Sequence, residues 1–217
     1  MKQTRILSIP VLAFLSLLAL FLQGCAEMGV VGVVGAGGVA FPVVDRRTTA
    51  VMVDDEGIEL RSTNRVSERF GDTVHVNITS YGRNVLVTGE VPNVATRAEI
   101  EKLIQGVPGV RGMTNELQVI DATSLTTRAT DTTITGKVKA RLFDSGKLNA
   151  LHVKVITENG VVYLLGIVTE AEANAAAEVA RTTGGVRKVV KVFDYCKPTE
   201  AICARGGKSE EPKKSGS

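Results

Sequence analysis

The chain has 217 residues, of which 44% are hydrophobic and 4% aromatic, and its formal net charge is +3 at pH 7. This length accommodates one mid-sized domain or two small ones. So small a positive excess identifies no partner by itself, and we expect no nucleic-acid ligand.

The amino-terminal segment has the organisation of an export signal. Lys2 and Arg5 precede an apolar run over residues 6–22. A membrane-spanning helix needs about 20 consecutive apolar residues, whereas Pro10 interrupts this run. We therefore predict a cleaved signal peptide over residues 1–24.

Cys25 closes the sequence Leu22-Gln23-Gly24-Cys25, which resembles the bacterial lipobox. In a lipobox the thiol receives a diacylglyceryl group and the cysteine becomes the amino terminus after cleavage. Ala26 follows, in place of the Asp that holds many lipoproteins at the inner membrane. The resemblance implies an outer-membrane lipoprotein that faces the periplasm and is permanently anchored by its acyl chains. The alternative is an ordinary signal peptide that contains a cysteine.

Residues 25–45 connect the predicted anchor to the rest of the chain. The stretch from residue 28 to residue 44 has no charge and many glycines. Because each glycine costs about 1 kcal/mol relative to alanine in a helix, a continuous helix is disfavoured. We expect either a flexible tether or a segment that lies on the bilayer surface or packs on the domains.

The remainder of the chain contains two copies of one small domain, residues 46–121 and residues 122–196. His75 aligns with His152 at an offset of 77 residues, and the segment "PGVRGM" matches "GGVRKV" at an offset of 76. A repeat of this length indicates tandem domains. Residues 121–127 are too few for a free linker, so the two domains are expected to touch or to be held close. Residues 197–217 form a tail that we expect to be mostly disordered.

Each copy is predicted to contain a helix, two strands joined by a polar turn, a second helix and a closing strand. In the first copy the elements are expected at residues 55–69, 74–80, 85–89, from a cap at Asn93 to Val107, and 110–119. In the second copy they are expected at residues 132–143, 152–157, 161–165, 170–181 and 186–195. Gly106 and Gly184 are predicted to be left-handed helix ends. The fold class is therefore α+β, with two tandem αββαβ domains, each a three-stranded mixed sheet with two helices on one face.

This order of elements, with "VNITSYGRNVLVTGEV" in the first copy and a Gly-Val pair before each closing strand, resembles the BON domain (bacterial OsmY and nodulation). Two such domains behind a lipobox and a glycine-rich tether resemble the dual-BON outer-membrane lipoproteins. The resemblance implies a non-catalytic protein that supports envelope integrity, binds anionic phospholipid through its second domain and gathers at the division site. The alternative is a periplasmic module that binds protein or peptidoglycan without direct lipid contact.

The first helix of the second copy, with the residues directly after it, holds the candidate lipid-binding residues. They combine basic side chains with an aromatic one, and they are Lys137, Lys139, Arg141, Phe143 and Lys147. Each basic side chain near an anionic surface contributes about 1 kcal/mol. The matching helix of the first copy mixes acidic and basic residues, and its acidic side chains make it a poor partner for anionic lipid, so we expect the second domain to bind. The alternative is a solvated helix face with Phe143 folded under onto the sheet.

One departure from the family bears on how the lipid is bound. A lipid-binding member of the family opens the equivalent helix with an exposed aromatic side chain, and here that region is Thr132-Thr133. Without this aromatic wedge, electrostatic docking is favoured over shallow insertion.

Catalysis, cofactor binding and metal binding have little support in the sequence. His75 and His152 are the only histidines, they occupy the same strand position in the two copies, and a metal site needs three or four ligands. We therefore predict no catalytic residues, no cofactor and no metal site. An enzyme would need a deep polar pocket with converging titratable groups.

Two cysteines remain in the carboxy-terminal part of the chain. Cys196 and Cys203 are separated by six residues. In an oxidising periplasm they are predicted to form a disulfide that fixes the start of the tail to the last strand.

Overall fold

The computed structural model of the protein describes residues 45–204, which span both repeats. These residues belong to one compact unit of the chain. The predicted signal peptide, Cys25 and nearly all of the tether lie outside the described residues, as does the end of the tail. Within the described range, no helix is both long enough and apolar enough to cross a bilayer.

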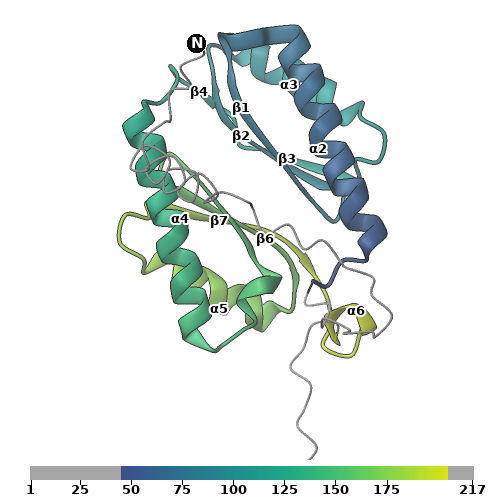
Figure 1. The fold of residues 1–217 in the computed structure, drawn as a ribbon, viewed down its shortest axis with the longest axis vertical. Coiled ribbons are helices and arrows are strands. Elements are labelled where there is room, and N and C mark those ends of the chain that lie inside the picture. The colour runs from purple at the N-terminus through teal and green to yellow at the C-terminus, as the bar shows by residue number, and fades with distance from the viewer. Residues whose placement is uncertain (1–44, 205–217) are drawn as a thin grey trace, which may run out of the picture. The chain divides into compact units, whose positions relative to one another are not determined.

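The first repeat has the predicted order of elements (Figure 1). Strand β1 pairs antiparallel with β2, and β2 pairs parallel with both β3 and β4, which are two pieces of the predicted closing strand. The elements are α2 (Thr49–Phe70), η1 (Gly71–Thr73), β1 (His75–Tyr81), β2 (Asn84–Val91), α3 (Val94–Gln105), β3 (Gly112–Asn115) and β4 (Gln118–Val119).

The second repeat follows the same order. Strand β6 pairs antiparallel with β5 and parallel with β7. The elements are α4 (Leu125–Ser145), η2 (Ala150–His152), β5 (Lys154–Glu158), β6 (Val161–Val168), α5 (Glu170–Arg181), β7 (Lys188–Tyr195) and α6 (Ala201–Ala204). The predicted α+β fold is confirmed, because in each repeat two helices cover one face of a three-stranded mixed sheet (Figure 1).

Side-chain caps determine where the first helix of each repeat begins. Thr48 accepts a hydrogen bond from the backbone amide of Val51, and Ser124 accepts one from that of Thr127. These caps satisfy amide groups that have no partner within the helix. Helices α2 and α4 therefore start six and seven residues earlier than predicted. Residues 121–127 therefore connect the two domains and also contain the first residues of α4.

Two further predictions about local structure were wrong. Gly106 ends α3 with a φ of −79°, and Gly184 lies beyond the end of α5 without a positive φ. The glycines with positive φ in these two turns are Gly109 and Gly185, with φ of 96° and 99°. The chain therefore reverses in the turn that leads into the closing strand and not at the helix end. His152 belongs to the single turn η2 and not to a strand, because the capping side chain of Asn149 starts that turn.

A buried aspartate in the first helix of each repeat holds the turn between the first two strands. Asp131 accepts the N–H groups of Asn159 and Gly160, both at 2.8 Å. Asp55 accepts the two equivalent N–H groups of the first repeat at 2.8 and 2.7 Å. Burial raises the pKa of Asp55, but the hydrogen bonds from Ser80, the turn backbone and Arg47 outweigh it and lower the pKa below its usual value.

Each repeat has an apolar core between its sheet and its helices. In the first repeat Ile58, Val87 and Ile100 are fully buried there. In the second repeat Val138 and Leu164 occupy the corresponding core. The apolar residues of α4 recur every fourth position, which is the spacing of one helix face.

A third apolar cluster joins the two repeats through the sheet faces that carry no helices. Leu86 of β2 lies in this cluster with Tyr163 and Leu165 of β6. Side chains alternate along a strand, so one face of each central strand packs on the helices of its own repeat and the other face packs on the other repeat. The two BON-like repeats therefore pack directly against each other.

Candidate functional site

The flank of α4 exposes the aromatic side chain among the predicted lipid-binding residues. Val138 and Leu142 point into the core. Lys139 comes directly after Val138, and Phe143 directly after Leu142, so these two side chains lie outside the buried face of the helix. Phe143 is 75% exposed. It therefore does not fold under onto the sheet, and the helix presents a ring beside an ammonium group.

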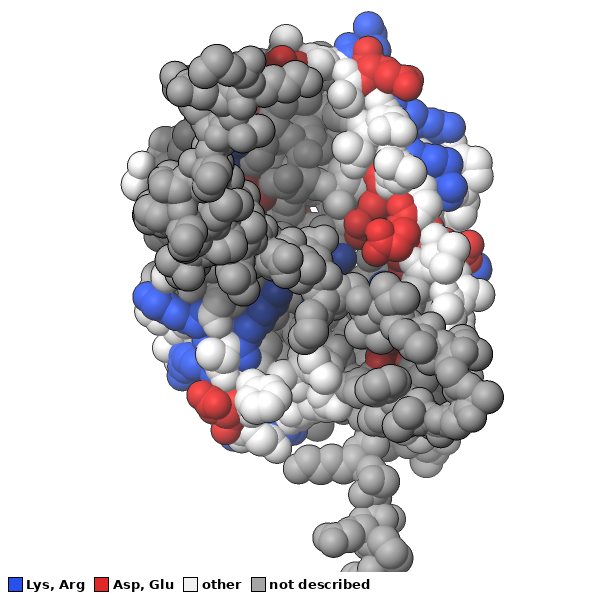
Figure 2. Space-filling view, viewed as in Figure 1, with Lys and Arg blue, Asp and Glu red and all other residues white. Residues whose placement is uncertain are grey.

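A second exposed apolar side chain lies near Phe143. Leu151 of η2 is 64% exposed, and it lines a cavity of about 360 Å³ together with Lys139 and Phe143. Lys147 lies on the exposed bend between α4 and η2. We name Lys139, Phe143, Lys147 and Leu151 the α4 patch. Figure 2 shows Lys and Arg side chains gathered over the lower part of α4, beside uncharged side chains and above a small acidic group.

Arg141 has a structural role that the sequence did not reveal. Its guanidinium donates to the carbonyl oxygen of Val179 at 3.1 Å and to the hydroxyl of Thr183 at 2.7 Å, which ties α4 to the end of α5. Arg65, the equivalent residue of the first repeat, donates in the same way to the carbonyl oxygen of Leu103. Because the same hydrogen bond occurs in both repeats, we infer that this arginine stabilises the packing of the two helices. Lys137 lies one turn before Arg141, on the flank away from Phe143.

The α4 patch has no counterpart in the first repeat. Thr63 and Ser67 of α2 stand at the positions equivalent to Lys139 and Phe143. Nearby, Asp54 of α2 forms an exposed ion pair with Arg83. The two repeats therefore share one fold but expose different chemistry on their first helices.

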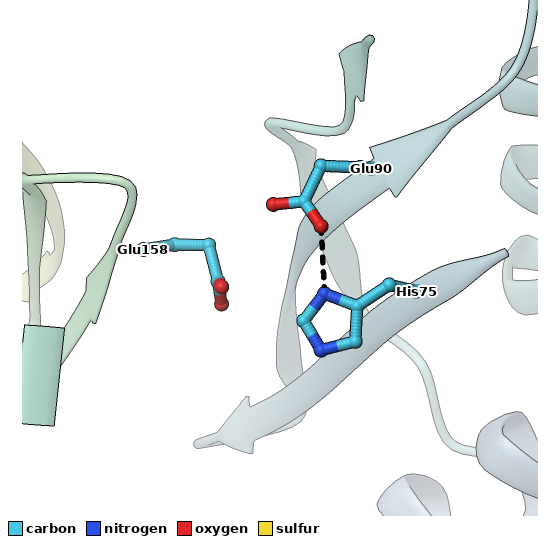
Figure 3. A group of neighbouring side chains, drawn as sticks. All are labelled: His75, Glu90 and Glu158. Carbon is cyan, nitrogen blue, oxygen red and sulfur yellow. Dashed lines mark hydrogen bonds and ion pairs between the residues drawn. The ribbon is translucent and has the colours of Figure 1, made fainter. Parts of the chain in front are cut away.

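A second polar group lies where the two repeats meet (Figure 3). His75 of β1 and Glu90 of β2 are cross-strand partners, and His75 Nδ1 lies 2.8 Å from a carboxylate oxygen of Glu90. The carboxylate of Glu158 from β5 points toward them (Figure 3). One ligand atom from each of the three residues lies within 4.8 Å of the other two.

Neighbouring residues orient the two carboxylates of this group. Glu90 accepts hydrogen bonds from the backbone amide and the hydroxyl of Thr123 at 3.3 and 3.2 Å. Glu158 accepts one from the side-chain amide of Asn77 at 2.8 Å. Burial raises the pKa of Glu158, and the charges of Glu90 and Asp131 raise it further, against the opposing effect of Asn77 and His75.

The sequence prediction treated the two histidines as equivalent, and the structure separates them. His152 is buried in the second repeat, with Nδ1 at 3.7 Å from the carboxylate of Glu172. At the position equivalent to Glu90 the second repeat has Ile167. The acidic partners of His75 were missed, although the hairpin register alone pairs His75 with Glu90.

The tail begins with a covalent link to the last strand. Cys196 and Cys203 form a disulfide with their Cα atoms 5.9 Å apart. Both cysteines also belong to the apolar cluster between the repeats. The cross-link thus holds α6 against the packed sheets.

The chain belongs to the BON-domain family, because the sequence model of that domain matches residues 54–121 and residues 130–197. The outer membrane lipoprotein DolP of Haemophilus influenzae is 42% identical over 187 residues, which cover 85% of this chain and 95% of DolP. The 21 kDa hemolysin of Actinobacillus pleuropneumoniae is 36% identical over 154 residues, or 70% of this chain and 79% of the hemolysin.

A third relative is the osmotically-inducible protein Y of Escherichia coli, which is 36% identical over 108 residues, or 48% of this chain and 54% of that protein. The family match and the relationship to DolP support an outer-membrane lipoprotein with two BON domains. They also point to a protein that is not an enzyme.

Proposed function

We propose that this chain is a non-catalytic outer-membrane lipoprotein that supports envelope integrity by docking its second BON domain on anionic phospholipid. The observation that carries the proposal is the exposed ring of Phe143 beside Lys139, on a helix whose counterpart in the first repeat has Ser67 and Thr63 instead. An apolar side chain next to a basic one suits the boundary between headgroups and acyl chains.

The size of the expected interaction explains what the docking would do. Lys139 and Lys147 contribute about 1 kcal/mol each near an anionic surface. Partial burial of Phe143 and Leu151 adds roughly 1 to 3 kcal/mol in total. A sum near 4 kcal/mol corresponds to a dissociation constant of about 1 mM. Such contact is weak by itself, but a tether supplies an effective concentration of similar size. Docking would therefore set the orientation of an anchored protein and not its attachment.

The α4 patch also offers apolar contact in place of the aromatic residue that is missing from the start of the helix. Thr132 and Thr133 stand where the lipid-binding family member has its aromatic residue, whereas Phe143 and Leu151 provide apolar contact at the other end. In place of the purely electrostatic docking that the sequence favoured, we expect shallow insertion at this end, combined with attraction between the lysines and the lipid phosphates.

Vesicle co-sedimentation of residues 42–217, which lack the lipid anchor, tests the proposal directly. The fragment should bind phosphatidylglycerol vesicles at low salt, bind phosphatidylcholine vesicles much less, and be released as salt screens the charges. Lys139→Glu and Phe143→Ser should each reduce the bound fraction several-fold. Arg141 is left unchanged because its substitution would also break the contact with α5.

Lys102→Glu is the matched control, since it makes the same change at an exposed position of α3 in the first domain. It should bind as the unsubstituted fragment does. Equal loss with Lys102→Glu would indicate a general charge effect. No binding to anionic vesicles would contradict the proposal and favour a protein or peptidoglycan target.

The proposed location at the division site needs a separate measurement in cells. A fluorescent fusion of the full chain should concentrate at the septum, and Lys139→Glu with Phe143→Ser should make the signal uniform around the envelope. An unchanged septal signal in this double variant would show that lipid docking by α4 does not direct the location.

A further inference from the structure

We propose that His75, Glu90 and Glu158 form a binding site for a divalent transition metal, and that Zn²⁺ is the ion their donor atoms fit. The three residues come from β1, β2 and β5, so the site draws on both domains. One donor atom of each lies within 4.8 Å of the other two. Nitrogen and carboxylate oxygen are both ligands of Zn²⁺, at about 2.0 to 2.2 Å.

The geometry of the group suits entry of a metal ion between two hydrogen-bonded ligands. His75 Nδ1 and a carboxylate oxygen of Glu90 now stand 2.8 Å apart in a hydrogen bond. Ligand atoms around a tetrahedral ion stand roughly 3.3 Å apart. The ion would enter between the ring and Glu90 while Glu158 draws closer from the other domain (Figure 3). The ion would replace this hydrogen bond, and the neutral ring would carry its hydrogen on Nε2.

Supporting hydrogen bonds already hold two of the three ligands. Thr123 donates twice to Glu90, and Asn77 donates to Glu158. Metal ligands in proteins are commonly oriented by such outer contacts. The contacts come from outside the group, so the carboxylates are positioned before any ion arrives.

The charge of the group also favours a cation. Glu90 and Glu158 are both buried. Within residues 45–204, neither carboxylate forms an ion pair with a lysine or an arginine, although Arg128 lines both neighbouring cavities. Among these residues, His75 is the one basic side chain shown in contact with Glu90. Buried carboxylates without full compensation are costly. A divalent ion would remove this cost for both residues together.

Cavities give an ion access to the site and room for a water ligand. His75 and Glu90 line a cavity of about 300 Å³. His75 and Glu158 line a second cavity of about 550 Å³. The group therefore lies between two openings. Three protein ligands with an accessible fourth position are an arrangement that Zn²⁺ accepts.

Calorimetric titration of the full chain in detergent, stripped with EDTA and kept under non-reducing conditions, tests the site with ZnCl₂. We expect one ion per chain. Glu158→Gln should weaken binding at least tenfold. Glu178→Gln makes the same change at an exposed position of α5 and should bind as the unsubstituted chain does. Equal binding by Glu158→Gln and the unsubstituted chain would overturn the proposal.

Thermal melting separates metal binding from a purely structural role of Glu158. In EDTA, Glu158→Gln should melt no lower than the unsubstituted chain, because the substitution removes repulsion between two buried carboxylates. ZnCl₂ should raise the melting temperature of the unsubstituted chain but not that of the variant. Equal stabilisation by MgCl₂ would indicate general screening of carboxylates and overturn the zinc assignment.

Asn77→Asp offers a test by gain of charge. It places a third carboxylate where an amide now donates to Glu158, so the variant should melt lower in EDTA. ZnCl₂ should then raise its melting temperature by more than it raises that of the unsubstituted chain. A destabilised variant that ZnCl₂ does not rescue would contradict a metal site at this position.

Discussion

Arg46 and Glu172 form a two-pronged ion pair, with nitrogen–oxygen distances of 2.8 and 2.9 Å. Arg46 precedes α2 of the first domain, and Glu172 belongs to α5 of the second. Arg46 also donates to the carbonyl oxygen of Ile167 at 2.8 Å. The segment that leads into α2 is therefore bound to the second domain beside α5.

Arg46→Met should lower the free energy of unfolding by about 3 kcal/mol, because it leaves a mostly buried carboxylate without its partner. Arg69→Met is the control, since Arg69 pairs with Glu99 at 2.6 Å but both side chains are exposed. The control should cost less than about 1 kcal/mol. Urea denaturation of residues 42–217 measures both. Equal costs would show that Arg46 contributes no more than a surface ion pair.

The same pair predicts a loss of stability in acid. Burial raises the pKa of Glu172, but the hydrogen bonds and charge of Arg46, with those from Thr169, outweigh it and lower the pKa to about 2. A carboxylate whose pKa is lower in the folded state stabilises the protein above its unfolded pKa, and the effect disappears as pH falls through the folded value.

Unfolding free energies of the unsubstituted chain and of Glu172→Gln should therefore differ by about 3 kcal/mol near pH 6. The difference should shrink as pH falls from about 4.5 to about 2, the range between the ordinary and the lowered pKa. Comparing the two chains cancels the other carboxylates. A difference that does not depend on pH would show that Glu172 acts by packing and not by its charge.

The aspartate that holds each hairpin turn is expected to be a major local contribution to stability. Asp131→Ala leaves the N–H groups of Asn159 and Gly160 without their acceptor, at a cost of about 2 to 4 kcal/mol. Asp144→Ala is the same substitution at an exposed position of α4 and should stay within about 0.5 kcal/mol. Thermal and chemical unfolding would measure both. A cost as small for Asp131 as for Asp144 would contradict this role.

Two glycine substitutions should have opposite effects. A Cβ at Gly166 of β6 would collide with the backbone carbonyl of His152, which cannot move aside as a side chain can. Gly166→Ala should therefore destabilise the protein by about 2 kcal/mol or more. Gly136→Ala meets open space on α4 and should stabilise by roughly 0.5 to 1 kcal/mol, because alanine favours helix. Melting temperatures that shift in the same direction for both variants would mean that the space around one of these glycines differs from that described.

Local patterns predicted the fold well because each element of the repeat carries its own periodicity and turn residues. The hairpin turn at Gly82 and Arg83 also sets the pairing of His75 with Glu90, so these two members of the polar group could have been predicted from the sequence. Glu158 was not, because it reaches the pair only through packing of two sheets. Packing of this kind depends on surfaces that no local pattern specifies.

The packed sheets did leave one signal in the sequence. The central strands "NVLVTGEV" and "VVYLLGIV" are buried on both faces, and the second is apolar at seven of its eight positions, glycine apart. A strand with one solvated face would alternate between apolar and polar residues.

The structural role of Arg141 left no such signal in the sequence. It depends on the carbonyl oxygen of Val179 being within reach, which follows from the packing of α4 on α5.

The contact between the two sheets predicts that Leu86 contributes strongly to the free energy of unfolding. Leu86 is 1% exposed and packs in the cluster that joins the repeats. Leu86→Ala removes apolar surface and leaves a cavity, so it should lower the free energy of unfolding by about 3 to 5 kcal/mol. Leu60→Ala, on the exposed side of α2, should change it by less than about 0.5 kcal/mol. Because Leu86 faces away from its own helices, a cost as small as that of Leu60 would mean that the two domains do not pack through these faces.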